Sequence, residues 1–246
     1  MTSRINADRA GLSTEQLDLI EQFEADYNAV DQFLRNALGA NKQVAFTQLV
    51  NEYSRKRAGW HDADLLRTIA SVRNAIIHGK TEPYRYPAVP TRATAQSLRG
   101  CLDRLINPAR AIPTFQRKVE SVSVHDSLAH VLKIVQHRDY SQFPVYGDNQ
   151  FRGLLTENGI TRWLAEHVTR ELSLVELEDV PVKQVLANEE KRKNYLFVPR
   201  EMPVEDVRCL FASQELLEAV LITAHGKESE ALLGIATRWD MIHLGR

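Results

Sequence analysis

Two segments in the second half of this 246-residue chain repeat one pattern of glycine, apolar residues and threonine. Residues 153–160 read GLLTENGI, and residues 234–241 read GIATRWDM. The stretches upstream also correspond, residues 142–146 with 218–222. In each copy the pattern predicts a strand, a helix, two strands and then a helix that begins at the threonine. The repeat therefore limits the second half to two small α/β units of the same design.

The first half has a helical pattern instead. Its apolar residues recur at three- and four-residue spacing, which indicates amphipathic helices. The expected helices begin near residues 14, 45, 62 and 95 and end near 38, 59, 79 and 106. Residues 82–90 hold three prolines and are expected to form an extended loop.

The pattern changes near residue 107, which places a domain boundary there. The predicted fold class is α+β, with an all-α four-helix bundle over residues 1–107. Residues 108–246 then form the repeated α/β part, with copies of roughly 108–175 and 176–246.

Composition and charge indicate the surroundings of the protein. Lys+Arg 31 against Asp+Glu 32 gives a net charge of -1, so no overall basic field favours a DNA partner. No apolar stretch approaches about 18 residues, and the start of the chain lacks the apolar part of a signal peptide. Cys101 and Cys209 lie far apart without neighbours that suit a metal. We expect a cytoplasmic protein with no membrane contact and no metal.

At the repeated segments the second half resembles a pair of CBS domains, the two-copy Bateman module. The hallmark of that family is a Gly, two apolar residues and a Thr or Ser, followed by an Asp three residues on. The resemblance covers about residues 110–246. It implies a regulatory ligand that is an adenine nucleotide, namely AMP, ADP, ATP or a related adenosyl compound.

The second copy has both polar hallmark residues, Thr237 and Asp240. A threonine at a strand-to-helix turn leaves N–H groups and a hydroxyl facing one point, which suits a phosphate. An aspartate one turn later can accept two ribose hydroxyls, although the same pair is also a capping box with a purely structural role. In the first copy Thr156 is present, but Gly159 stands where the acid is expected. We therefore expect one competent site, around the second copy.

The other expected ligand contacts come from nearby residues of the second copy. Adenine would fit between apolar strand residues, for which Tyr195, Phe197, Ala219 and Val220 are the candidates. Arg238 could reach the phosphates, although an exposed arginine beside a helix cap is common. The three tryptophans are interpreted as packing residues rather than as platforms for base stacking.

The third predicted helix ends in Arg73, Asn74 and His78, followed by Gly79. This motif resembles the signature of HEPN domains, helical bundles that dimerise and are often metal-independent endoribonucleases. The resemblance implies that His78 activates the RNA 2′-hydroxyl or protonates the leaving oxygen, and that Arg73 neutralises the phosphorane charge. Asn74 would orient the phosphate or the histidine. The alternative is an ordinary helix end, where cationic residues and glycine are common.

The first predicted helix supports this resemblance with a stripe of Tyr27, Asp31, Leu34 and Arg35, similar to the acid and arginine of several HEPN groups. Together the two halves predict a homodimer or larger homo-oligomer, in which nucleotide binding gates cleavage of an RNA substrate in a stress, defence or toxin-like role. The alternative is a non-catalytic module whose nucleotide controls dimerisation or partner docking.

Overall fold

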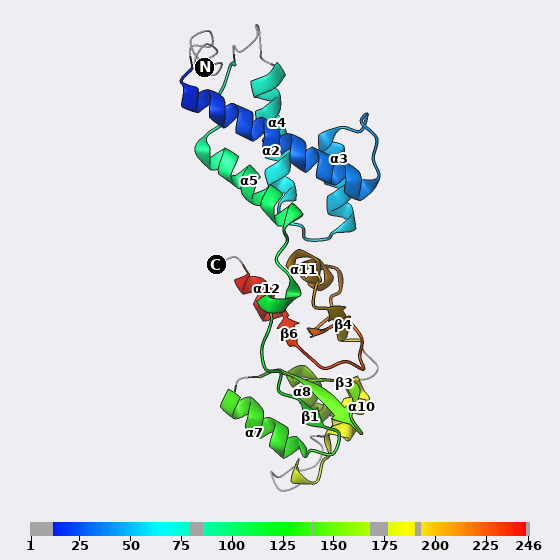
Figure 1. Cartoon of the computed structure of the whole chain (residues 1–246). Helices are drawn as coiled ribbons and strands as arrows, with labels where there is room; N and C mark the ends of the chain where they lie inside the picture. Colours follow the sequence, from blue (N-terminus) through cyan, green and yellow to red (C-terminus); the bar gives the residue numbers. More distant parts are fainter. Residues whose placement is uncertain (1–11, 79–85, 139, 168–176, 190–192, 245–246) are drawn as a thin grey trace. The chain divides into compact units, whose positions relative to one another are not determined.

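The chain divides into two compact units, Met1–Ala109 and Arg110–Arg246, so the division lies close to residue 107. The computed structural model of the protein describes residues 12–78, 86–138, 140–167, 177–189 and 193–244. The first unit is helical, and the second combines helices with strands (Figure 1). None of the helices in these ranges is long and apolar enough to cross a membrane.

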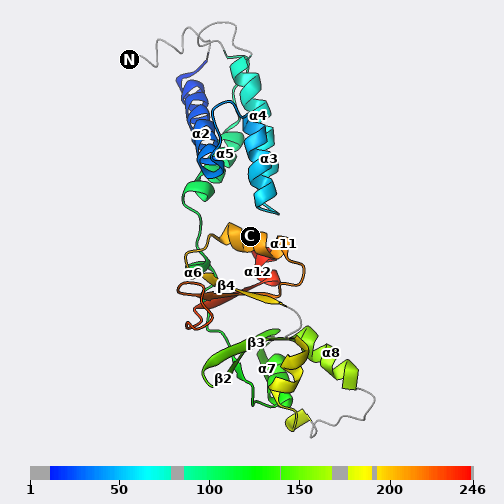
Figure 2. The same ribbon diagram turned by 90° about the vertical axis from the view of Figure 1, so that its right-hand side faces the viewer.

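The first described helix of the helical unit is well capped. The described helices of this unit are α2 (Thr14–Leu38), α3 (Phe46–Lys56), α4 (Ala63–His78) and α5 (Arg92–Ile106), seen from two sides in Figures 1 and 2. α2 starts at Ser13, whose side chain accepts a hydrogen bond from the Gln16 N–H, while the Gln16 side chain accepts one from the Ser13 N–H. It ends at Gly39, where a φ of 64° is easily adopted without a Cβ. The expected loop at residues 82–90 lies partly outside the described residues.

The core of this unit contains two buried carboxylates beside its apolar side chains. Phe23, Leu49, Leu66, Ile69 and Leu98 are among the fully buried residues. Asp26 of α2 accepts a hydrogen bond from Arg99 of α5 over 2.7 Å. Asp62, just before α4, accepts two from Arg104 of α5, over 3.1 and 2.5 Å. Because a buried carboxylate is costly without a partner, these pairs fix α5 against the neighbouring helices.

The second unit contains two three-stranded sheets of the same design within its described residues. The strands are β1 (Val122–Ser123), β2 (Gln142–Gly147), β3 (Gln150–Thr156), β4 (Tyr195–Pro199), β5 (Ala219–Thr223) and β6 (Gly234–Thr237). The helices are α6 (Ala111–Thr114), α7 (Leu128–Arg138), α8 (Glu157–His167), α10 (Val182–Glu189), α11 (Val204–Ser213) and α12 (Arg238–His243). In both sheets the first two strands are parallel and the last two antiparallel, so the sequence repeat is also a structural repeat.

The first residues of the first copy complete the apolar core of the second. Ala111, Ile112 and Phe115 are buried against β4, β5, β6 and α11. The Ala111 N–H donates to the carbonyl of Met202 over 2.8 Å, and the Ile112 N–H donates to that of Arg200 over 3.1 Å. Residues 110–116 therefore belong to the second copy in packing, although they begin the first copy in sequence.

The reverse exchange occurs at the start of the second copy. Val182, Val185 and Leu186 of α10 are buried in the core of the first copy, against β2, β3 and α8. The Val182 N–H also donates to the carbonyl of Asp126 over 2.8 Å. The predicted copies 108–175 and 176–246 follow the sequence repeat. In the structure, however, the first segment of each copy packs in the apolar core of the other copy.

A separate apolar cluster joins the two sheets. Its buried members are Phe151, Leu154, Ala219, Leu221 and Ile235. The Phe151 ring meets the rings of Tyr195 and Phe197 edge-on, with 5.0 Å between ring centroids in both pairs. The aromatic side chains of β4 are thus used in packing between the sheets.

Gly234→Ala tests the packing of the leading segment against β6. A Cβ on Gly234 would lie 2.2 Å from the carbonyl oxygen of Phe115, so the backbone must move. We expect the variant to lower the free energy of unfolding by about 1–3 kcal/mol, the usual cost of overpacking. Gly100→Ala in α5 is the control, since its nearest neighbour is the Arg104 side chain at 3.4 Å. Denaturant unfolding followed by circular dichroism measures both, and wild-type stability of Gly234→Ala would contradict this packing.

Candidate functional site

The predicted pair at the start of α12 lies together in the structure. The Thr237 N–H donates to Oδ2 of Asp240 over 2.7 Å, and the Thr237 hydroxyl donates to the same oxygen over 2.9 Å. Thr237 has an extended backbone and is the N-cap of α12. The pair forms a capping box, which is the structural alternative that the sequence left open. The carboxylate therefore stabilises the helix start, whatever else it binds.

Another donor reaches the same carboxylate from the segment between α6 and β1. Arg117 Nη2 lies 2.5 Å from Oδ2 of Asp240, and Arg117 Nε donates to the Ile235 carbonyl over 2.9 Å. Within the described residues, no hydrogen bond reaches the other carboxylate oxygen, Oδ1. The Arg117 side chain is 44% exposed and that of Asp240 is 19% exposed. An ion pair with this access to water contributes little net stability and can be exchanged for another anion.

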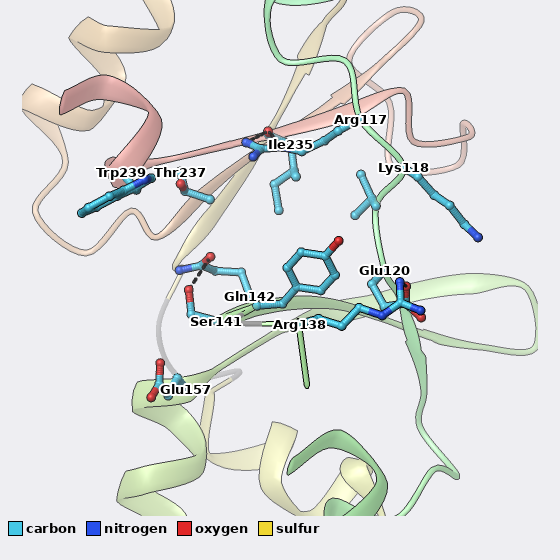
Figure 3. A pocket seen from close by; sticks show the side chains of 12 residues that line it. Arg117, Lys118, Glu120, Arg138, Ser141, Gln142, Glu157, Ile235, Thr237 and Trp239 are labelled. Atoms are coloured by element: carbon cyan, nitrogen blue, oxygen red, sulfur yellow. Dashed lines mark hydrogen bonds and ion pairs between the residues drawn. The ribbon is translucent and has the colours of Figure 1, made fainter. Parts of the chain in front are cut away.

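Thr237 and Arg117 line an open pocket of about 530 Å³ within the second unit. Arg117, Lys118, the end of β6 and the start of α12 form one side of it (Figure 3). Arg138, Ser141 and Gln142, between α7 and β2, lie on the opposite side (Figure 3). The pocket thus draws its walls from both copies of the repeat.

Two aromatic side chains line this pocket with much of their surface exposed. Trp239 is 69% exposed and Tyr140 is 39% exposed. An exposed indole beside a polar pocket offers a flat apolar surface on which a planar ring can stack. The interpretation of Trp239 as a packing residue was therefore wrong, because its ring contacts His243 but stays largely exposed, whereas Trp60 and Trp163 are each 5% exposed.

The lining of the pocket carries charges of both signs. Arg117, Lys118 and Arg138 supply positive charge, and Glu120 and Glu157 supply negative charge. One of the acids is already paired, since Arg138 Nη1 lies 3.7 Å from Glu120 Oε2. In the parts of the chain that the structure describes, no three His, Cys, Asp or Glu side chains are grouped as a metal site requires.

The matching position in the first copy lacks the carboxylate. Thr156 is 2% exposed, and its hydroxyl accepts a hydrogen bond from the Gly159 N–H over 3.0 Å. Glu157, the next residue, lines the pocket instead. The two helix starts are therefore unequal, and the complete Thr and Asp pair belongs to the second copy.

Residues 110–166 match the CBS domain family. This segment is a CBS domain. Comparison with curated proteins finds no match to the chain. Among solved structures, a hemolysin-like protein containing a CBS domain from Oenococcus oeni is 18% identical, covers 56% of this chain and 90% of its own, and has a TM-score of 0.41.

Two further solved structures resemble the chain in the same way. A conserved CBS domain protein of Thermoplasma acidophilum is 20% identical, with coverage of 56% of this chain and 70% of its own and a TM-score of 0.43. A CBS domain-containing protein of Kribbella flavida is 14% identical, with coverage of 55% of this chain and 97% of its own and a TM-score of 0.41. At these identities and TM-scores the likenesses say nothing about ligand or activity.

The predicted adenine walls are packed inside the second unit. Ala219 and Val220 are fully buried in β5, and Tyr195 and Phe197 pack in the cluster between the sheets. None of the four lines the pocket at Thr237. The strand pattern identified these residues correctly as apolar, but their side chains pack against other side chains of the protein.

Arg238 also has a different role from the predicted phosphate contact. Its guanidinium donates to the carbonyls of Phe211, Gln214 and Glu215, over 3.2, 2.8 and 2.7 Å. These carbonyls lie at the end of α11 and just after it, where a helix leaves backbone acceptors without partners. Arg238 therefore holds α12 to the end of α11, and it does not line the pocket.

Arg117 and Tyr140 were not predicted as site residues. Arg117 lies 123 positions before Asp240, and nothing in the local pattern links the two. The sequence held a weak signal for Trp239 as a site residue. Trp239 lies in the hallmark segment two residues after Thr237, a position that does not have to be packed in the core.

The helical unit brings some of its predicted residues together. Arg73 lies over the ring of Tyr27, with 5.4 Å from Cζ to the ring centroid. Asp31 and Arg35 form a two-pronged ion pair one turn further along α2, over 2.6 and 3.0 Å. Burial raises the pKa of Tyr27 to about 12, partly offset by the charge of Arg73. Tyr27 is therefore a neutral phenol at physiological pH.

The remaining predicted residues lie on α2 and α4. Asn74 is exposed on α4, and His78 is the last residue of α4, with a side chain outside the described residues. Leu34 is fully buried and so belongs to the core. Arg35 also donates to the carbonyls of Asn41 and Val44, over 2.5 and 2.9 Å. These hydrogen bonds fix the connection between α2 and α3 to the end of α2.

Asp240→Ala tests the structural share of this carboxylate. The variant loses the cap of α12 and the Arg117 ion pair, so we expect the free energy of unfolding to fall by about 1–2 kcal/mol. Asp179→Ala, at an exposed aspartate of the same unit, is the control and should unfold like wild type. Thermal unfolding without ligand compares the three proteins. Equal melting temperatures for both variants would show that the capping box contributes no stability.

Proposed function

We propose that the second unit is a regulatory module, a tandem CBS pair, that binds one adenine nucleotide in the pocket at Thr237. The observation that carries this proposal is that Thr237 and the exposed ring of Trp239 line one open pocket, while Asp240 is hydrogen-bonded to Thr237 and paired with Arg117 of the same lining. The CBS domain at residues 110–166 supports it, because domains of this family commonly bind adenine nucleotides. The repeated topology of β4–β6 supports a second CBS copy.

Each part of a nucleotide has a suitable partner in the pocket. The adenine ring stacks on the largely exposed ring of Trp239, on the surface that His243 does not contact. Ribose hydroxyls donate to Oδ1 of Asp240, the carboxylate oxygen that the capping box does not use. The phosphates meet Arg117 and Lys118. Gly159 offers no such carboxylate in the first copy, so the proposal gives the module a single complete site.

Tryptophan fluorescence tests the proposal directly. Trp239 is exposed while Trp60 and Trp163 are buried, so quenching of emission by iodide reports mainly on Trp239. ADP, ATP or AMP is expected to change the emission and to protect it from iodide. Trp239→Leu should lose this signal and bind more weakly by about 1 kcal/mol or more, the scale of base stacking on an aromatic side chain.

Trp163→Phe is the matched control and should keep the nucleotide response, since its ring is buried in the CBS core. A response that persists in Trp239→Leu would place the nucleotide elsewhere. No response to any of the three nucleotides in the wild-type protein would contradict the proposed ligand.

For the helical unit we propose a HEPN-type, metal-independent endoribonuclease whose activity the nucleotide gates. The observation that favours it is the placement of Arg73 beside Tyr27 and the Asp31–Arg35 pair, which groups cationic and acidic side chains from α2 and α4. In the proposed reaction His78 and Arg73 act on RNA within a homodimer in the cytoplasm, and the products carry a 2′,3′-cyclic phosphate. The alternative is a docking or dimerisation platform controlled by the same nucleotide.

Cleavage of a mixed, labelled RNA pool in EDTA separates these alternatives. We expect the wild-type protein to cleave, and Arg73→Ala and His78→Ala to lose cleavage by at least about a hundredfold, as removal of a general acid or base does. Arg67→Ala removes an exposed arginine from the same helix and should retain activity. No cleavage by wild type with or without ATP and AMP would eliminate the nuclease and leave the docking module.

A further inference from the structure

The Arg117 side chain pairs with the carboxylate that the proposed ribose contact also uses, through the other of its two oxygens. Its Nη2 lies 2.5 Å from Oδ2 of Asp240, and its guanidinium also donates to the Ile235 carbonyl. Both partners belong to the second copy, whereas Arg117 comes from the segment that leads into β1. The positive charge of Arg117 therefore lies directly on the carboxylate that the proposed function assigns to the ligand.

This arrangement has a different consequence for charged and uncharged ligands. A nucleoside without phosphate must share Asp240 with Arg117 and offers the guanidinium nothing in return. A nucleotide brings phosphate oxygens, which are better partners for a guanidinium than a single carboxylate oxygen. We propose that Arg117 is the specificity-determining residue of this pocket, which selects phosphorylated over unphosphorylated nucleosides by exchanging Asp240 for a ligand phosphate. The inference rests on the proposed nucleotide site.

The surroundings of Arg117 permit the exchange. Its side chain is 44% exposed and lines the pocket, so the guanidinium can turn toward a ligand without leaving a buried position. The backbone before it is held by an antiparallel bridge between Gln116 and Gly234. When Arg117 leaves, Asp240 keeps the Thr237 N–H and hydroxyl as donors. The capping box therefore survives the exchange.

The other cations of the pocket differ from Arg117 in this respect. Lys118 lines the pocket without an ion pair to Asp240, and Arg138 lies 3.7 Å from Glu120. Either side chain can attract phosphate, but neither competes for the hallmark carboxylate. Lys118→Met is therefore a matched control, since it removes one positive charge from the same pocket and leaves the Arg117–Asp240 pair in place.

Isothermal titration of the full-length protein with adenosine and with ADP tests the inference through the ratio of the two dissociation constants. In Arg117→Met we expect adenosine to bind more tightly, because Asp240 is no longer shared. ADP should bind at least about tenfold more weakly, the scale of one lost hydrogen bond to a charged group. The preference for ADP over adenosine then collapses. In Lys118→Met adenosine binding should stay unchanged while ADP binding weakens.

Arg117→Lys gives a second, milder variant, which keeps the charge but loses the planar fork of donors, and its preference should lie between those of wild type and Arg117→Met. Equal weakening of adenosine and ADP in Arg117→Met would show a merely structural role and overturn the inference while leaving the nucleotide site intact. An unchanged preference would overturn it too. If the wild-type protein binds neither ligand, the proposed function fails first, and the inference fails with it.

Discussion

Close backbone packing of residues 110–117 against the second copy of the repeat determines what the candidate site contains. Phe115 passes so near Gly234 that a methyl group would not fit between them, and Ala111 donates to the Met202 carbonyl. This contact carries Arg117 to Asp240 across 123 positions of sequence. A loosely attached leading segment would leave the pocket with the hallmark pair alone, without the cation that meets it.

In the proposed site the Asp240 carboxylate combines two roles that the sequence presented as alternatives. Oδ2 caps α12 through Thr237 and pairs with Arg117, and the proposal assigns the ribose to Oδ1. A structural cap and a ligand contact are therefore compatible in one side chain. The cap restricts the carboxylate to one orientation, which lowers the entropy that a ligand would otherwise lose in ordering it.

The sequence predicted what depends on local pattern and missed what depends on distant contacts. The repeat gave two sheets of one topology, and the spacing of Thr237 and Asp240 gave a pair that the structure brings together. The alternation in β4 identified Tyr195 and Phe197 as apolar without showing that their side chains would be covered by Phe151 of the other sheet. Contacts such as Arg117 with Asp240 arise from the exchange of leading segments, which no local pattern encodes.

A crystal structure of the protein grown with ADP tests the central claim most directly, because it locates the nucleotide atom by atom. The account predicts adenine on Trp239, ribose hydroxyls at Asp240, and phosphates at Arg117, with Arg117 turned away from the carboxylate. ADP bound at another surface, or an occupied pocket in which the ribose does not contact Asp240, would contradict it.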